Sequence, residues 1–182
     1  EMPHFLFEAK KKLEDMSLQE LWRLFPIELA VANPRLKTYF DEEKNFLTAT
    51  LPEKAVYRIS HIGSTAVKNI SAKPIVDILL EAPAALDLET LNTVLCRNGY
   101  LCMSKSKDRI SLNKGYTEDG YAEKVFHIHL RVKGDNDELY FRDFLNDYPE
   151  IAKRYEALKL ELSEKFRYDR DAYTQAKSDF VT

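Results

Sequence analysis

The chain has 182 residues, 45% of them hydrophobic and 31% charged, a composition typical of a soluble globular protein with one core. Its net charge of -3 argues against a general nucleic-acid binder, because such proteins usually carry a basic surplus. The apolar runs are too short to cross a bilayer and no secretory signal pattern opens the chain, so we expect a cytoplasmic protein without membrane binding. Cys96 and Cys102 cannot form a framework of several disulfides and are expected to be packed thiols.

The first third of the chain predicts helices followed by the start of a sheet. Ser17 and Glu20 form a capping-box pattern for a short helix that ends near Phe25. A longer amphipathic helix is expected over residues 36–47, and a strand over residues 56–62.

The next strand, residues 75–80, is apolar on both faces apart from Asp77, as expected for a strand covered on both sides. The later elements are expected at residues 87–97 (helix), 100–103 (strand), 109–114 and 123–133 (hairpin strands), and 139–148, 151–162 and 169–180 (helices). Asp147 and Glu150 form a second capping-box pattern between the first two of these last helices.

These elements predict one α/β (α+β) domain over residues 1–182. We expect a helical lead-in over residues 1–54, a sheet core over 55–133 and a C-terminal helical block over 136–182. No internal repeat or low-complexity linker divides the chain.

A small-residue turn and a lone acid carry the strongest functional signal. The turn Gly63-Ser64-Thr65 separates the first two strands, and its backbone N–H groups and hydroxyls suit an anion. Asp77 offers a hard oxygen ligand to a divalent cation. The alternative is a structural ion pair between Asp77 and Lys73 or an arginine, which also makes a carboxylate in an apolar run tolerable.

A second polar group lies on the expected strand over residues 125–132. Alternation puts His127, His129 and Arg131 on one face and apolar residues on the other. Two imidazoles and a guanidinium suit the wall of a cleft for phosphate or carboxylate ligands. The alternatives are a solvated edge face, or metal binding by the histidines with Asp77 as third ligand.

Three stretches resemble the GrpB family. HIGSTAVKNISAKPIVDI (residues 61–78) is similar to the family signature HIGSTAVPGL-x-AKP-x-x-DI, and FHIHLRV (residues 126–132) resembles its HLHV strand. Residues 141–181 resemble its C-terminal helical block. The resemblance implies a nucleotidyltransferase-like fold of the polymerase-beta-like superfamily, with a mixed sheet flanked by helices. It implies no particular substrate, although some members are fused to dephospho-CoA kinase.

The resemblance also implies roles for individual residues. In the wider superfamily the serine of a Gly-Ser turn contacts nucleotide phosphate, a place that Ser64 takes here, and the following strand carries an acid-x-acid pair. Asp77 matches the first acid, but Leu79 stands at the place of the second. Two-metal phosphoryl transfer needs closely spaced carboxylates, so the standard metal site is incomplete. His127 or His129 would then serve as a base or as an additional ligand.

Other residues are expected to complete a pocket. Lys73, Arg131 and Arg142 would balance phosphate charge, and His61 would orient the turn. Tyr173 and Lys177 lie four apart, so one helix face can present both from the helical block.

Three hypotheses follow for the function. The first is a nucleotidyltransferase-like enzyme that binds a nucleoside triphosphate with Mg²⁺ or Mn²⁺ and transfers a nucleotidyl group to an unidentified acceptor. The second is a non-catalytic binding module for a phosphorylated metabolite or a coenzyme-A-related ligand, which the leucine at position 79 explains directly. The third is a scaffold whose helical block is a partner surface.

Overall fold

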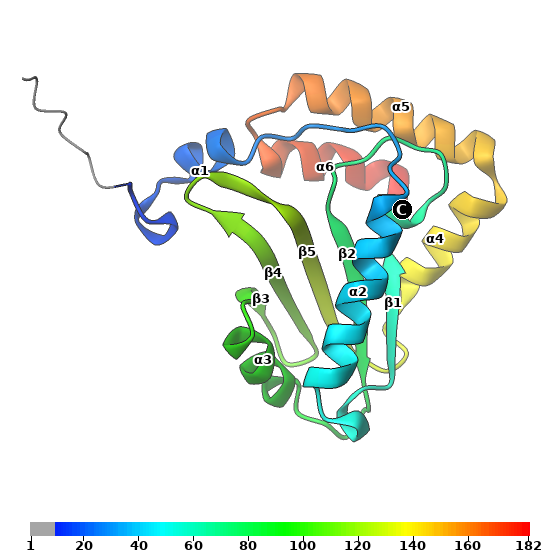
Figure 1. Cartoon of the computed structure of the whole chain (residues 1–182). Coiled ribbons are helices and arrows are strands. Elements are labelled where there is room, and N and C mark those ends of the chain that lie inside the picture. The colour runs from blue at the N-terminus through cyan, green and yellow to red at the C-terminus, as the bar shows by residue number, and fades with distance from the viewer. Residues whose placement is uncertain (1–9) are drawn as a thin grey trace, which may run out of the picture.

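The computed structural model describes residues 10–182, so the expectation about a signal pattern at the start of the chain falls largely outside the described residues. A five-stranded mixed sheet forms the centre, with the order β1-β2-β5-β4-β3 (Figure 1). The strands are β1 (Arg58–Ile62), β2 (Val76–Ala82), β3 (Leu101–Lys105), β4 (Arg109–Thr117) and β5 (Gly120–Val132). This architecture confirms the expected fold class.

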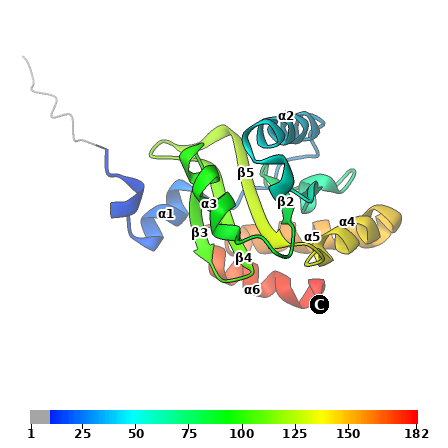
Figure 2. The same ribbon diagram turned by 90° about the horizontal axis from the view of Figure 1, so that it is seen from below.

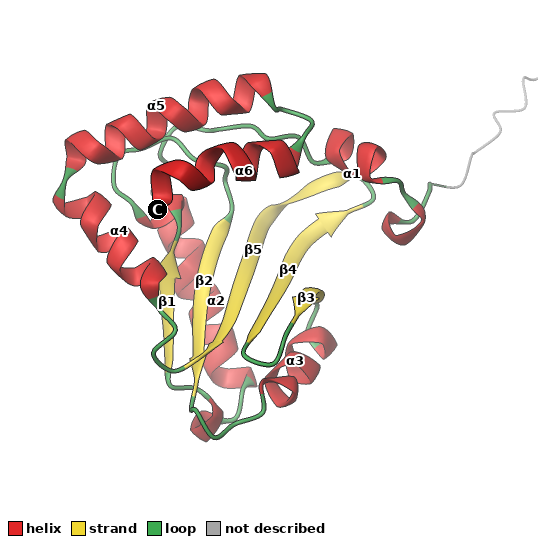
Figure 3. Ribbon diagram, turned by 180° about the vertical axis from the view of Figure 1, so that it is seen from behind, coloured by secondary structure: helices red, strands yellow, loops and turns green. Residues whose placement is uncertain are grey.

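Helices flank the sheet on both faces. The α-helices are α1 (Leu18–Leu24), α2 (Arg35–Thr50), α3 (Leu88–Arg97), α4 (Asp137–Asp147), α5 (Pro149–Lys165) and α6 (Arg170–Val181). Single 3-10 turns are η1 (Leu13–Asp15), η2 (Glu53–Ala55) and η3 (Ser64–Ala66). Helices α2 and α3 lie on one face, and the block α4–α6 lies on the opposite side (Figures 2 and 3). Within residues 10–182, no helix is both long and apolar enough to cross a bilayer.

The helix ends follow local capping chemistry. Ser17 and Glu20 form the expected capping box at α1, because each side chain bonds to the other residue's backbone N–H. The prediction of a capping box between Asp147 and Glu150 is wrong. Helix α5 begins at Pro149, whose fixed φ already suits the first helical position, and no side chain caps it.

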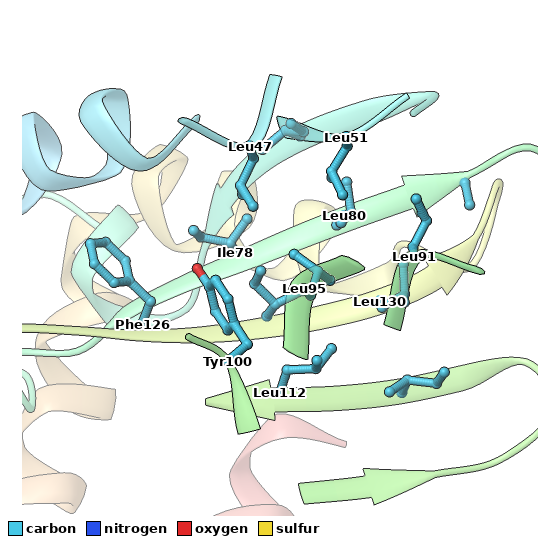
Figure 4. Close-up of a cluster of buried hydrophobic side chains, with 14 of the residues drawn as sticks. Leu47, Leu51, Ile78, Leu80, Leu91, Leu95, Tyr100, Leu112, Phe126 and Leu130 are labelled. Atoms are coloured by element: carbon cyan, nitrogen blue, oxygen red, sulfur yellow. The ribbon is translucent and has the colours of Figure 1, made fainter. Parts of the chain in front are cut away.

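The main core lies between the sheet and the pair α2 and α3. Alternate residues of β2 and β5, among them Ile78, Leu80, Phe126 and Leu130, point into it (Figure 4). Because β2 and β5 are neighbours, their other alternate residues share the face toward the helical block. The predicted alternation along residues 125–132 is therefore confirmed.

The expectation of packed cysteines is wrong. Cys96 and Cys102 are both exposed. Cys102 lies on the edge strand β3, whose five residues are all exposed, and Cys96 lies near the end of α3 on its outer side. Because β3 is an edge strand, with β4 on one side and α3 as the main helix in contact with it, its side chains stay exposed although three of the five are apolar or sulfur-containing.

The residue in place of a second acid is buried. Leu79 has no exposed surface and packs with Ile62 of β1 and Leu139 of α4. On the face of β2 that carries Asp77, Leu79 therefore separates two carboxylates, Asp77 and the buried Glu81, and Glu81 is paired with Arg58.

We expect Leu79→Asp to lower the free energy of unfolding by about 3 kcal/mol or more, because it leaves an unpaired charge among apolar side chains. Urea unfolding measures this. The matched control is Leu101→Asp on the exposed strand β3, for which we expect a loss below about 1 kcal/mol. Equal midpoints for Leu79→Asp and the wild type would contradict the packing described here.

Candidate functional site

The parallel pairing of β2 with β5 brings one acid and two histidines together. Asp77 lies opposite His127 in the ladder, and Leu79 lies opposite His129. Oδ1 of Asp77 is 3.3 Å from Nε2 of His129 and 3.6 Å from Nδ1 of His127. On its other side, His127 Nε2 is 2.6 Å from the hydroxyl of Tyr116. Tyr116, His127 and Asp77 thus form a polar chain that runs from β4 across β5 to β2.

The electrostatics of this chain favour an ionised acid beside neutral histidine. Burial alone would raise the pKa of Asp77, but the hydrogen bond from His129 and the nearby positive charge of Lys73 bring the pKa below its ordinary value. Burial lowers the pKa of His127 to about 4, so its ring is neutral at pH 7. In the tautomer with the proton on Nδ1, His127 turns an N–H toward the carboxylate at 3.6 Å, and Nε2 accepts from the Tyr116 hydroxyl.

The Gly-Ser turn is pressed against Asp77. Gly63 has φ of 73°, and a Cβ placed on it would lie 2.5 Å from Oδ2 of Asp77, so glycine is required both by conformation and by space. The hydroxyl of Thr65 donates to the carbonyl oxygen of Ile75 at 2.9 Å and lies 2.9 Å from Nε2 of His61. His61 therefore supports the turn through Thr65, and the turn borders the carboxylate.

A cavity of about 390 Å³ opens beside the turn, between the sheet and the helices α5 and α6. Helix α6 crosses the end of the sheet where β2 begins (Figure 3). We call it the cationic cavity; the residues that line it are Leu29, Gly63, Ser64, Thr65, Lys73, Ile75, Asp77, His127, His129, Phe141, Leu145, Tyr155, Lys159, Arg170, Tyr173, Thr174 and Lys177.

Four cations and one carboxylate line this cavity. Burial, together with Arg170 and Lys177, lowers the pKa of Lys73 to about 8. Burial and Lys177 lower the pKa of Lys159 to about 7, and burial also lowers the pKa of Lys177. These shifts show that positive charge is crowded and poorly solvated there.

The lysines contact neutral groups. Lys73 and Lys177 place their ammonium groups 5.5 and 5.2 Å from the ring centre of Tyr173. Lys159 donates to the carbonyl oxygen of Ser71 at 2.9 Å and lies over the Tyr155 ring. Within residues 10–182, no ion pair joins these lysines to an acid within 4.0 Å. Their charge is therefore available to an anionic ligand.

Three of the residues expected in the pocket lie elsewhere. Arg131 shares the strand face of His127 but sits four residues, about 13 Å, further along β5. It is 2.9 Å from Glu138 and 3.4 Å from Asp135, whose carboxylates occupy its guanidinium. The expectation that Arg131 faces the same cleft as the histidines is wrong, because the segment after β5 brings its own acids to that end of the face.

Arg142 and His61 line a different cavity, on the other side of η3. Arg142 donates to the carbonyl oxygen of His61 at 2.9 Å and to Asp143 at 2.8 Å. Its guanidinium is thus committed to the backbone of β1 and to α4, away from the cationic cavity.

Sequence reasoning missed Lys159, Arg170 and Tyr155. One signal was present: Lys159 falls on the buried stripe of α5, in step with Tyr155 and Leu162. Burying a lysine within an apolar helix stripe costs free energy unless the amine binds a ligand or pairs with another group. Arg170 had no such signal, because its place depends on how α6 packs on the sheet.

The donor set does not fit the two-metal arrangement of phosphoryl-transfer enzymes. Among the described residues, no group of three or more His, Cys, Asp or Glu side chains is arranged to hold a metal ion. Asp77 is the one carboxylate on the cavity wall, and the packed side chain of Leu79 fills the place of its expected partner.

Comparison with solved structures defines the class of fold. The GrpB protein of Enterococcus faecalis aligns with a TM-score of 0.66 and 27% identity, over 85% of this chain and 97% of that one. A Cid1 poly(U) polymerase, solved with MgGTP bound, aligns with a TM-score of 0.52 over 82% of this chain and 46% of that one. Its identity is 13%, so it shows the fold alone, which is that of a nucleotidyltransferase.

The sequence comparisons give the family. The model of the GrpB protein family matches residues 26–182, and the chain belongs to this family. It is 37% identical over 150 residues to the glutamate-rich protein GrpB of Alkalihalophilus pseudofirmus, covering 80% of this chain and 86% of that protein. It is 31% identical over 171 residues to protein YqkA of Bacillus subtilis, covering 90% of this chain but about half, 48%, of that longer protein.

We expect Gly63→Ala to destabilise the protein by more than Gly134→Ala. Both glycines have positive φ, so both substitutions carry backbone strain of about 1–3 kcal/mol. Only Gly63→Ala also drives a methyl group into Asp77, since nothing lies within 4 Å of the Cβ position at Gly134. Chemical denaturation of both variants measures the difference. Equal losses would show that the turn does not press on Asp77.

Proposed function

We propose that the cationic cavity binds a phosphorylated small molecule, with nucleoside triphosphates as the first candidates. The observation that carries this proposal is the enclosure of three lysines and Arg170 around a single carboxylate. With the lysines protonated, four positive charges face one negative charge, and an anion of about three charges would balance the difference. The negative charge of such a ligand would stabilise the protonated amines and so offset the effect of burial on the lysine pKa values.

Phosphate suits this cavity better than a single carboxylate does. The ammonium groups approach from different elements: Lys73 precedes β2, Lys159 is on α5 and Lys177 is on α6. Dispersed point charges fit a ligand with several anionic oxygens. Ser64 and Thr65 add hydroxyl groups on the wall next to Asp77. The likeness to a polymerase solved with MgGTP supports nucleotides as the first class to test.

The second candidate function is nucleotidyl transfer. It is favoured by the contact between the Gly63 turn and Asp77, which sets an ionised acid directly beside the expected phosphate position. A single Mg²⁺ or Mn²⁺ carried by the triphosphate would need only one carboxylate from the protein, and Asp77 would supply it. Nδ1 of His129, whose Nε2 faces Asp77, would accept the proton of the attacking hydroxyl, and pyrophosphate would be the leaving group. If no transfer occurs, the same cavity serves a binding module for a phosphorylated or coenzyme-A-related ligand.

The first test is a calorimetric titration of the wild type with ATP, GTP, CTP, UTP, coenzyme A and tripolyphosphate. We expect Lys159→Gln to weaken the affinity for the ligand that binds best about tenfold or more, the effect of losing one charge-assisted hydrogen bond. Lys165→Gln is the matched control, since Lys165 is exposed on the same helix. Saturable binding unchanged in Lys159→Gln would place the ligand elsewhere, and no binding by any probe would overturn the proposal.

Asp77→Asn separates the two candidate functions. Without divalent metal, we expect this variant to bind tripolyphosphate more tightly than the wild type does, because a negative charge leaves the cavity wall. If Asp77 holds a metal, Mg²⁺ or Mn²⁺ will strengthen nucleotide binding in the wild type and not in Asp77→Asn. Equal metal enhancement in both proteins would exclude Asp77 as a metal ligand.

Affinity for phosphate compounds is expected to fall as pH rises from 7 to 9. Lys159 and Lys73 have pKa values of about 7 and 8 in the free protein, so they lose their protons over this range. A bound anion favours the protonated amines, so binding takes up protons. Titrations in buffers of different ionisation enthalpy measure this uptake. Proton release on binding at pH 8 would contradict the assignment of the lysines.

A further inference from the structure

A second cavity of about 560 Å³ lies on the opposite side of the Gly-Ser turn from the cationic cavity. It is bordered by the segment before α2, by α2 itself, by the loop that follows η3 and by α4, and it is open to solvent along the exposed segment before α2. We call it the apolar cavity, because Val31, Ala32, Val67 and Ile70 form much of its wall. The two cavities share one lining residue, Thr65.

The polar groups of the apolar cavity carry little uncompensated charge. Lys37 pairs with Asp41 at 2.8 Å, and Arg142 is occupied by Asp143 and the His61 carbonyl oxygen. Burial lowers the pKa of His61 to about 4, so its ring is neutral at pH 7. Lys68 is exposed at the rim. The apolar cavity therefore has little net charge, in contrast to the cationic cavity.

An aromatic pair forms part of the cavity wall. The rings of Phe40 and His61 are stacked, with centroids 4.9 Å apart and an interplanar angle of 14°. Aromatic rings that pack on one another gain energy beyond simple area burial, so a ligand ring placed against this pair would gain it as well. The side-chain amides of Asn33 and Asn69 belong to the same lining and supply hydrogen-bond donors and acceptors.

We propose that the apolar cavity binds an uncharged planar ring, a nucleobase or another aromatic heterocycle, held against the Phe40–His61 pair. A mostly apolar cavity of this volume, with a few converging polar groups, is typical of small-molecule sites. The pairing of Lys37 with Asp41 and of Arg142 with Asp143 leaves little charge for an ionic ligand, and the stacked pair favours a flat one. The proposal does not rest on phosphate binding, because the cations of the other cavity do not line this one.

The test is saturation-transfer NMR and calorimetry with adenine, uracil and indole as planar probes and cyclohexanol as a non-planar control. We expect at least one planar probe to bind with a Kd of about 1 mM or tighter. Ala32→Trp fills the cavity and should weaken this binding at least tenfold. Ala85→Trp, at an exposed alanine outside both cavities, should leave it unchanged.

Two substitutions of one residue isolate stacking. His61→Phe and His61→Ala both remove the contact with Thr65, but only His61→Phe keeps a planar ring. We expect His61→Phe to retain probe binding and His61→Ala to weaken it at least fivefold. The proposal is overturned if no planar probe binds, if cyclohexanol binds equally well, or if Ala32→Trp leaves binding intact. Binding of tripolyphosphate to Ala32→Trp should equal that of the wild type. A failure of ring binding in the apolar cavity is thus distinguishable from a failure of phosphate binding in the cationic cavity.

Discussion

The parallel pairing of β2 with β5 is the constraint on which the rest of the structure depends. It joins the strand that carries Asp77 to the strand that carries His127 and His129, in a register that sets the acid opposite the first histidine. The same pairing sorts side chains by face: the apolar ones meet α2 and α3, and the polar ones meet the helical block. A shift of one residue would exchange these faces, so the buried core maintains the site geometry.

Packing of the helical block creates the electrostatic character of the site. Lys159 and Lys177 come from two different helices, and they meet Lys73 only because α5 and α6 fold back over the start of β2. Burying these amines opposes folding, since it lowers their pKa values below those of the unfolded chain. The free protein therefore carries an electrostatic strain that an anionic ligand would relieve. That strain is the strongest argument in the molecule for phosphate binding.

Much of this fold could be predicted from the sequence, because it depends on local patterns. Helix caps such as Ser17, the alternation along β5 and the glycine of the turn are all local signals. The cationic cavity could not be predicted in the same way, because its cations are far apart in sequence. For Arg131, the alternation predicted the correct face of the strand but not its partners. The acids that neutralise it, Asp135 and Glu138, belong to the segment that follows the strand.

A crystal structure of the protein with tripolyphosphate tests most directly whether the enclosed cations form a phosphate site. We expect phosphoryl groups in the cationic cavity, within hydrogen-bond distance of the ammonium groups of Lys73, Lys159 and Lys177 and beside the turn at Ser64. Tripolyphosphate bound only on the outer surface, with the three lysines still directed at the tyrosine rings and the Ser71 carbonyl oxygen, would contradict this expectation.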